Sequence, residues 1–456
     1  MKHQCIEVTF TSTHQYITHI MVYFLRSNRL RFLLPSALLL FSFSHPVLAV
    51  VFGKVLQPYA SYTFTADDNI LRIRDKQPAP DRPEENQVLF NAITRGHLAD
   101  FSHRLTGGLI FEKEISRQRL SANFNWTHTR FEKFDYMNNN LKSANGNWNW
   151  FLGNRLEGNM GASYIQSLMP NTFQPGIRAI RTEQIQFING AWHFHPSWRL
   201  NGEYTRYDLN VNSSLEIMRF LARTEDRFEG GIDYVTASKN TIGVLFRNVL
   251  GDFTNPPQQS SQSSNFDYDQ KEVLTKINWI VSAKSRFLWT GGWVERKNDG
   301  NIQSNGRTQF DERAQLDFSG FNARLAYTWQ PTDKLGLTIN GWRQTGSPQN
   351  LTASFSLNTG VSVIPSWNIT EKIRFEGDLS YETRNFKRLN PSNPESELLG
   401  QHNTFRNAAV KLIYNPYLGL QLSATAYHAD LDSDSNRGGF NANGVNVNLQ
   451  YIYGKR

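Results

Sequence analysis

The sequence predicts an all-β protein, a transmembrane antiparallel β-barrel of about 18 strands with short periplasmic turns and long extracellular loops. Three observations predict this fold. Segments in which apolar and polar residues alternate occur through most of the chain, and short connections between these segments alternate with long ones. In addition, no apolar run after Ala49 reaches the length of a membrane-spanning helix.

A short turn followed by strict alternation recurs along the chain. Three examples are WHFHPSWRLNGEYTRYD (192–208), TWQPTDKLGLTINGWRQTG (328–346) and IYNPYLGLQLSATAYHA (413–429). A period of two places successive side chains on opposite faces of a strand. The repeated turn therefore predicts repeated β-hairpins.

The connections have the order expected of such a barrel. Eight short turns are predicted at 116–118, 152–154, 195–198, 237–240, 282–285, 331–334, 369–372 and 415–419. Nine longer polar connections lie between them, at 67–98, 133–143, 167–181, 209–224, 251–269, 297–312, 344–352, 385–402 and 430–439. Seventeen connections join eighteen strands, and the long connection 67–98 is a candidate plug of the lumen. A soluble sandwich or propeller also has evenly spaced strands, but no propeller repeat is found.

The N-terminal region has the features of a secretory signal peptide. Arg26, Arg29 and Arg31 precede the apolar segment FLLPSALLLFSF (32–43), and VLA at 47–49 provides a cleavage site. We expect residues 1–49 to be the signal peptide, with Met21 as an alternative start, and residues 50–456 to be the barrel. The single cysteine, Cys5, lies in the segment expected to be removed.

Composition and motifs point away from several functions. A formal net charge of +8 over 456 residues does not suggest a nucleic-acid partner. The chain after Ala49 has no motif of a hydrolase, metalloprotease or nucleotide-binding site, so we expect neither an enzyme nor a cofactor. His193 and His195 share one strand face, but they lack a third ligand nearby and are interpreted as interface residues beside a turn.

The two faces of the strands can be assigned from their alternation. One parity is apolar, as in Leu156–Tyr164 and 375–381, and we expect it to contact lipid. The other parity is polar and is expected to line the lumen. The candidate lumen residues are Arg119, Asn123, Arg155, Glu157, Asn159, Arg199, Asn201, Glu203, Arg286, Lys334, Arg374, Glu376 and Asp378. Aromatic residues at both ends of the apolar stripes are typical of interfacial girdles.

Six of the candidate lumen residues share a position. A basic residue stands just before the first lipid-facing residue after six of the eight short turns: Arg119, Arg155, Arg199, Arg286, Lys334 and Arg374. These side chains are predicted to form a basic ring inside the periplasmic mouth. In the alternative interpretation they reach lipid head groups or the carbonyls of the turns.

Three stretches of the chain resemble a known group of proteins. FEKEISRQRLSANFNWTHTRFEKF (111–134), GNWNWFLGNRLEGNMGASY (146–164) and GAWHFHPSWRLNGEYTRYDL (190–209) resemble the EpsL-type outer-membrane proteins of exopolysaccharide operons, which are similar to beta-barrel-porin-2 proteins. The resemblance implies a conduit for exopolysaccharide in the bacterial outer membrane. It also implies three kinds of partner: extracellular polysaccharide, outer-membrane lipid, and periplasmic and inner-membrane export proteins. A general or small-solute porin, an adhesin and a barrel-embedded hydrolase are the alternatives. One departure is the C-terminal sequence LQYIYGKR, which does not end in an aromatic residue.

Overall fold

The computed structural model describes residues 55–73, 97–169, 178–215, 219, 221–254, 258–259, 262–263, 267–298, 303–304, 307–308, 317–346, 353–388, 402–434 and 439–454. The predicted signal peptide and residues 74–96 of the candidate plug lie outside these residues, so both stay predictions. Within the described part of the chain, no helix is long and apolar enough to cross a membrane.

Eighteen long strands form one sheet. Their bounds are β1 Leu56–Asp67, β2 Asp100–Ile115, β3 Gln118–Phe131, β4 Asn139–Leu152, β5 Leu156–Leu168, β6 Ala179–His195, β7 Trp198–Ser213, β8 Arg223–Val235, β9 Thr241–Phe253, β12 Tyr268–Ser282, β13 Ser285–Asn298, β16 Phe318–Trp329, β17 Leu335–Gly346, β18 Ala353–Asn368, β19 Ile373–Arg388, β20 His402–Tyr417, β21 Leu420–Ser433 and β22 Phe440–Ile452.

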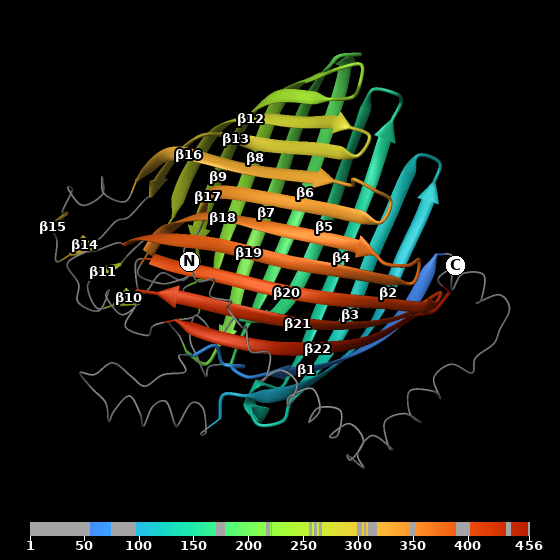
Figure 1. The fold of residues 1–456 in the computed structure, drawn as a ribbon. Helices are drawn as coiled ribbons and strands as arrows, with labels where there is room; N and C mark the ends of the chain where they lie inside the picture. The colour runs from blue at the N-terminus through green and yellow to red at the C-terminus, as the bar shows by residue number, and fades with distance from the viewer. Residues whose placement is uncertain are drawn as a thin grey trace, which may run out of the picture. The chain divides into compact units, whose positions relative to one another are not determined.

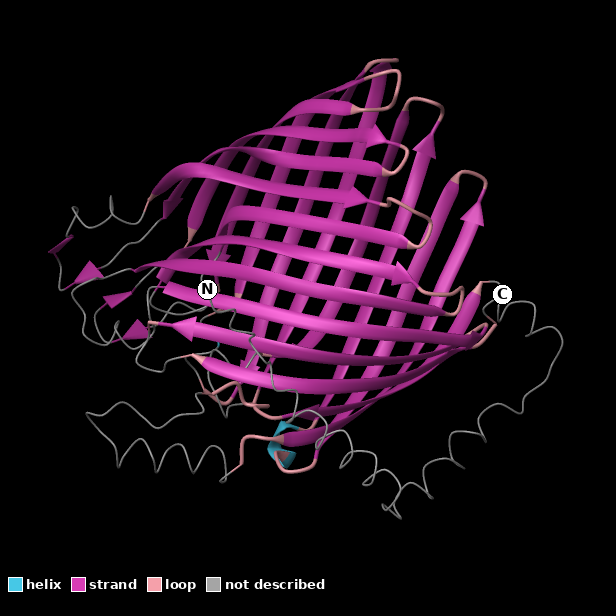
Figure 2. Ribbon diagram, in the orientation of Figure 1, coloured by secondary structure: helices cyan, strands magenta, loops and turns pink. Residues whose placement is uncertain are grey.

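Shorter elements lie in the long connections. Two-residue strands form two small sheets: β10 (Gln258–Gln259) with β11 (Gln262–Ser263), and β14 (Gln303–Ser304) with β15 (Arg307–Thr308). A single turn of 3-10 helix, η3 (Asp135–Met137), precedes β4 and is drawn in cyan in Figure 2. These elements do not interrupt the sequence of barrel strands.

The large sheet closes on itself. Each barrel strand pairs antiparallel with its neighbours in the chain, and β1 also pairs with β22, from Tyr59 opposite Ile452 to Asp67 opposite Gly444. Figure 1 shows the front and back strands crossing at an angle, as the strands of a closed, tilted barrel do. The prediction of an 18-stranded antiparallel barrel is confirmed.

The short turns all lie at one end of the barrel, at the upper right in Figure 1. All eight occur where the sequence predicts them, and the nine long connections leave the opposite end. Gly153 and Gly419 have φ angles of 59° and 86° in two of these turns. Glycine adopts this left-handed conformation without a steric penalty, which explains its place in the tight turns.

The apolar face of the strands is exposed, as predicted. Leu379 is 52% exposed, Phe246 61% and Trp293 59%. A soluble protein does not leave such a continuous set of large apolar side chains in water. Aromatic residues predicted at the ends of the apolar stripes include Tyr164 and Tyr204, which are half-buried, and a set that is exposed: Trp126, Phe194, Trp198, Trp293, Trp329, Tyr381 and Tyr414.

Strands of 12 to 17 residues are longer than the ~10 residues needed to cross the membrane. The additional residues lie at the end with the long connections, where the outward face becomes charged. Arg206 follows Tyr204 on that face and pairs with Asp226, with 3.5 Å between Nη1 and Oδ2. Glu295 follows Trp293 in the same way and pairs with Lys297. The apolar band therefore ends at the aromatic residues, and the strands continue beyond it.

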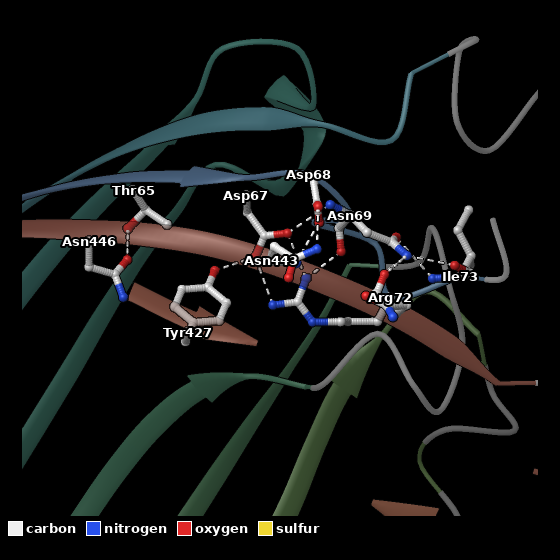
Figure 3. Close-up of polar contacts among 10 residues, drawn as sticks. Thr65, Asp67, Asp68, Asn69, Arg72, Ile73, Tyr427, Asn443 and Asn446 are labelled. Carbon is white, nitrogen blue, oxygen red and sulfur yellow. Dashed lines mark hydrogen bonds and ion pairs between the residues drawn. The ribbon is translucent and has the colours of Figure 1, made fainter. Parts of the chain in front are cut away.

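The seam between β1 and β22 is held by polar contacts at its outer end (Figure 3). Arg72 donates two hydrogen bonds to the carboxylate of Asp67, at 2.8 and 2.7 Å. Tyr427 of β21 donates to the same carboxylate, and Asn443 of β22 donates to Asp68. Burial acts to lower the pKa of Arg72, but the hydrogen bond and charge of Asp67 outweigh it and raise that pKa. The segment after β1 is thereby fixed to β21 and β22.

Buried apolar side chains gather at the end of the barrel that carries the long connections. Leu71 packs with Phe131, Phe134 and Met137 beside this seam. Similar small clusters form between β6 and β7, between β9 and β12, and between β21 and β22. In the described residues, the barrel is thus stabilised by strand pairing and by these clusters at one rim.

Candidate functional site

The polar face of the strands lies opposite the exposed apolar face. Cross-strand partners keep one parity around the whole sheet, so one set of residues shares one side of the wall. On this polar side the charged residues pair across neighbouring strands and are partly buried. We assign this side to the lumen, because the exposed apolar side must meet lipid.

A row of charged residues crosses four strands of this inner face. Glu203 of β7 lies opposite Glu229 of β8, which lies opposite Arg247 of β9, which lies opposite Glu272 of β12. Two carboxylates placed opposite each other would destabilise the sheet. Arg227 lies between them, with its guanidinium 2.9 Å from Glu203 and 3.1 Å from Glu229. We call these five residues the charge ladder.

The ladder is continued by Arg247, which bridges two carboxylates. Its Nε is 2.7 Å from Glu229 and its Nη1 is 2.8 Å from Glu272. The side chains of Glu229 and Glu272 are 12% and 4% exposed. Each charged residue of the ladder thus has at least one neighbour of opposite charge. This wall is therefore polar, but its electrostatic potential is not strongly positive or strongly negative.

A second group of charges lies nearer to the short turns. The buried carboxylate of Asp233 is 2.8 Å from Arg199 and 3.1 Å from Lys276. Towards the long connections, Arg223 pairs with Glu225 at 2.7 Å. The buried guanidinium of Arg296 lies 3.4 Å from the centre of the Tyr268 ring.

The charge ladder borders a recess in the wall of about 430 Å³. Its lining includes charged, amide and aromatic side chains from β7 to β17, among them Arg227, Arg247, Glu272, Tyr268 and Arg324. Arg324 donates a hydrogen bond of 2.9 Å to Gln344. A recess of this size and composition can hold a small hydrophilic solute.

The inner face of β3, β4 and β5 has a different character. Between the short turns and the outer rim it bears hydroxyl and amide side chains and no charge. We call the following residues the neutral wall: Ser121, Asn123, Asn125, Thr127, Ser143, Asn145, Asn147, Asn149, Asn159, Gly161 and Ser163. Amide groups both donate and accept hydrogen bonds, so this wall can bind uncharged polar groups.

The structure places the six predicted ring residues in unequal environments. Arg119, Arg199, Arg286 and Arg374 lie within strands, whereas Arg155 and Lys334 lie in turns. Arg199 pairs with Asp233. Arg374 pairs with Glu376 at 2.8 Å, and Arg119 lies 3.9 Å from Glu112.

The remaining three ring positions differ again. Arg286 donates to the amide oxygen of Asn278 at 2.9 Å. For Arg155 and Lys334, the described residues offer no carboxylate within ion-pair distance. Six equivalent free cations are thus not found, and the ring stays a prediction that rests most directly on Arg155 and Lys334.

The other candidate lumen residues lie on the same inner face. Asn123 accepts a hydrogen bond of 3.5 Å from Tyr59, and Asn159 contacts Asn189. Asn201 has a buried amide nitrogen without a hydrogen-bond partner among the described residues. Glu203 belongs to the charge ladder, Glu376 pairs with Arg374, and Asp378 is exposed.

Sequence reasoning missed four of the five ladder residues. Arg227, Glu229, Arg247 and Glu272 were outside the strands used to assign the faces. Each alternates with an apolar neighbour such as Phe228, so parity alone could have placed them on the inner face. Their pairing needed the register between strands.

A second recess, of about 520 Å³, lies at the short turns. It is lined by Arg117, Arg155, Glu157, His193 and His195, among others. Glu157 lies 3.0 Å from His193 Nε2. No group of three or more potential metal ligands occurs in the described residues.

In comparisons with known proteins, only the fold of this chain is similar. No family model matches the sequence, and no curated protein matches it. OccK2 (OpdF) of Pseudomonas aeruginosa is 8% identical, with 87% of this chain and 98% of that chain covered and a TM-score of 0.44. A BenF-like porin of Pseudomonas fluorescens Pf-5 is 9% identical, with coverages of 88% and 100% and a TM-score of 0.42. OccAB3 of Acinetobacter baumannii is 10% identical, with coverages of 87% and 99% and a TM-score of 0.42.

At these identities and TM-scores, the similarities assign no solute to this chain. The EpsL-type resemblance is not supported by them. The geometry of the chain itself defines its class. A closed antiparallel sheet satisfies its backbone hydrogen bonds internally, which allows it to cross lipid with an apolar exterior and a polar interior. The chain is an outer-membrane β-barrel protein of a bacterial cell.

Proposed function

We propose that this protein is a porin that lets small hydrophilic solutes cross the outer membrane. The observation that carries the proposal is the inner face, where a charge ladder with balanced neighbours stands beside a neutral wall. A barrel of about 18 strands is wide enough to leave an aqueous lumen. Along such a wall, a solute can replace its hydrogen bonds to water with hydrogen bonds to side chains, and it is not bound tightly at any one point.

Liposome swelling tests this proposal. Vesicles that contain the purified protein should swell in isotonic monosaccharide and amino-acid solutions, and the rate should fall steeply for solutes above a few hundred daltons. Vesicles with heat-denatured protein are the control. Equal rates with active and denatured protein would refute a porin.

A polymer conduit for exopolysaccharide is the second candidate. The three stretches that resemble EpsL-type proteins fall on the hairpins β2–β3, β4–β5 and β6–β7, which include the neutral wall. Its partners would be extracellular polysaccharide and export proteins on the periplasmic side, with outer-membrane lipid around the barrel. In a deletion strain, a conduit predicts polymer retained in the periplasm, whereas a porin predicts normal secretion and slower solute uptake.

A further inference from the structure

An aromatic ring stands beside the neutral wall on the inner face. Phe187 of β6 lies directly opposite Gly161 of β5. A Cβ at Gly161 would come within 2.9 Å of the Cε1 and Cζ atoms of this ring. The ring therefore leans across the glycine, in the space that a side chain would fill, and it remains half-buried.

Amide groups lie near this ring on the side of β4 and β5, whereas on its other side Thr205 of β7 lies opposite it and accepts a hydrogen bond from Arg227. Asn147 of β4 lies opposite Gly161, and Asn159 of β5 lies opposite Asn189 of β6. Asn159 donates to the amide oxygen of Asn189 from its backbone, at 3.0 Å, and from its side chain, at 3.3 Å. Asn147 donates to Asn149. Within the described residues, the side-chain nitrogens of Asn189 and Asn149 have no acceptor, so they can donate to a solute.

Other inward rings also lean over glycines. Phe318 leans over Gly320, but it packs on the Phe355 ring, with 5.3 Å between the ring centroids. Two further rings are tied to polar partners. Trp342 leans over Gly360 and donates to Glu382 at 2.7 Å. Tyr427 leans over Gly444 and donates to Asp67. Such ring-over-glycine pairs stabilise sheets. Phe187 has the same packing but no polar group, and its surroundings on β4 and β5 are uncharged amides.

We propose that Phe187 and the amides of Asn147, Asn159 and Asn189 form a binding site for neutral sugars in the lumen. A pyranose ring presents an apolar face, which an aromatic ring can cover, and hydroxyl groups, which amides can bind as donors and acceptors. The inner faces of β4 and β5 around the ring carry no charge except Glu157 near the short turns. On the β7 side, Arg227 is already paired with Glu203 and Glu229, so an acidic sugar gains no unpaired cation there. This inference rests on the proposed porin function and names a solute class for it.

Equilibrium dialysis with the purified full-length protein in detergent tests the site without requiring an open channel. The probes are maltotriose, which is neutral, and trigalacturonate, which has similar size and carries three carboxylates. Wild-type protein should bind maltotriose and should bind trigalacturonate at least about tenfold more weakly. Phe187→Leu keeps an apolar side chain and removes the ring, and it should weaken maltotriose binding by about threefold to tenfold.

Trp342→Leu is the matched control, since it also removes an inward ring that leans over a glycine. Its maltotriose affinity should equal that of wild type. Asn189→Leu provides a second variant if Phe187→Leu does not fold, and it should also weaken binding. Heat-modifiable mobility on gels checks the folding of all three variants.

Three results would overturn the site: no maltotriose binding by wild type, tighter binding of trigalacturonate, or equal losses in Phe187→Leu and Trp342→Leu. Ion conductance in planar bilayers separates this outcome from failure of the porin proposal. A protein that conducts ions but binds no maltotriose refutes the sugar site alone. A protein that binds maltotriose but conducts no ions refutes the porin and leaves the site intact.

Discussion

Removal of Arg247 is the most informative perturbation of the inner wall. This guanidinium bridges Glu229 and Glu272 at 2.7 and 2.8 Å, and the two carboxylates are 12% and 4% exposed. In Arg247→Met, Glu229 retains Arg227, whereas Glu272 retains only the amide of Gln270 among the contacts described. The variant thus leaves a nearly buried carboxylate without a cation.

Loss of one partner from a hydrogen-bonded, desolvated charge pair costs about 2–5 kcal/mol. The Arg247 side chain is 23% exposed, so water in the lumen screens part of this cost. We expect Arg247→Met to lower the free energy of unfolding by about 2–3 kcal/mol, at the lower end of that range. Urea unfolding in lipid vesicles, followed by the mobility of folded and unfolded forms on gels, measures this change.

Lys297→Met is the matched control. Lys297 pairs with Glu295 at 3.3 Å on the outward face beyond the apolar band, and both side chains are more than half exposed. An exposed pair contributes about 0–1 kcal/mol, so this variant should unfold almost as wild type does. Equal losses in the two variants would refute the argument that the ladder is a desolvated, mutually compensated set of charges.

Three further predictions concern the faces, the short-turn end and the ring over Gly161. Leu379→Arg should lose about 2–4 kcal/mol or fail to insert, whereas Asp378→Arg should insert normally; equal insertion efficiencies would contradict the face assignment. Arg199→Gln should lower heat stability, because buried Asp233 then keeps one cation among the described residues, Lys276. Arg155→Gln should instead shift the reversal potential in a salt gradient towards cation selectivity at unchanged stability. Gly161→Ala places a Cβ 2.6 Å from the Gly146 carbonyl oxygen and 2.9 Å from the Phe187 ring, and should cost about 1–3 kcal/mol of unfolding free energy; a neutral effect would contradict the close approach of β4 and of the ring to Gly161.

The strand count, the eight turns and the exposed face follow from local sequence patterns. Alternation with a period of two is a property of each strand alone, and turn residues such as Gly153 and Gly419 mark hairpins without reference to distant parts of the chain. These features could therefore be predicted. The strands exceeded the length needed to cross lipid, because their outer ends continue past the girdle with outward charges such as Arg206 and Glu295.

The inner wall could be predicted only in part. Parity places Glu203 and Arg199 on the polar face, but it does not tell which residues they meet. Glu203 reaches Arg227, and Arg199 reaches Asp233, through the register of β7 against β8, which depends on the turns and on the stagger of the whole barrel. The ring hypothesis treated the basic residues as free because Asp233 and Glu112 were not visible as their neighbours.

Single-channel recording in planar bilayers tests the central claim most directly, namely that this barrel encloses a polar path across the outer membrane. Purified protein should insert as discrete, stable conductance steps whose size rises in proportion to salt concentration, with weak ion selectivity because the charges of the inner wall are mostly paired. Absence of conductance steps from folded, heat-modifiable protein would contradict an open polar lumen, and strong selectivity for one ion sign would contradict the compensated charge ladder.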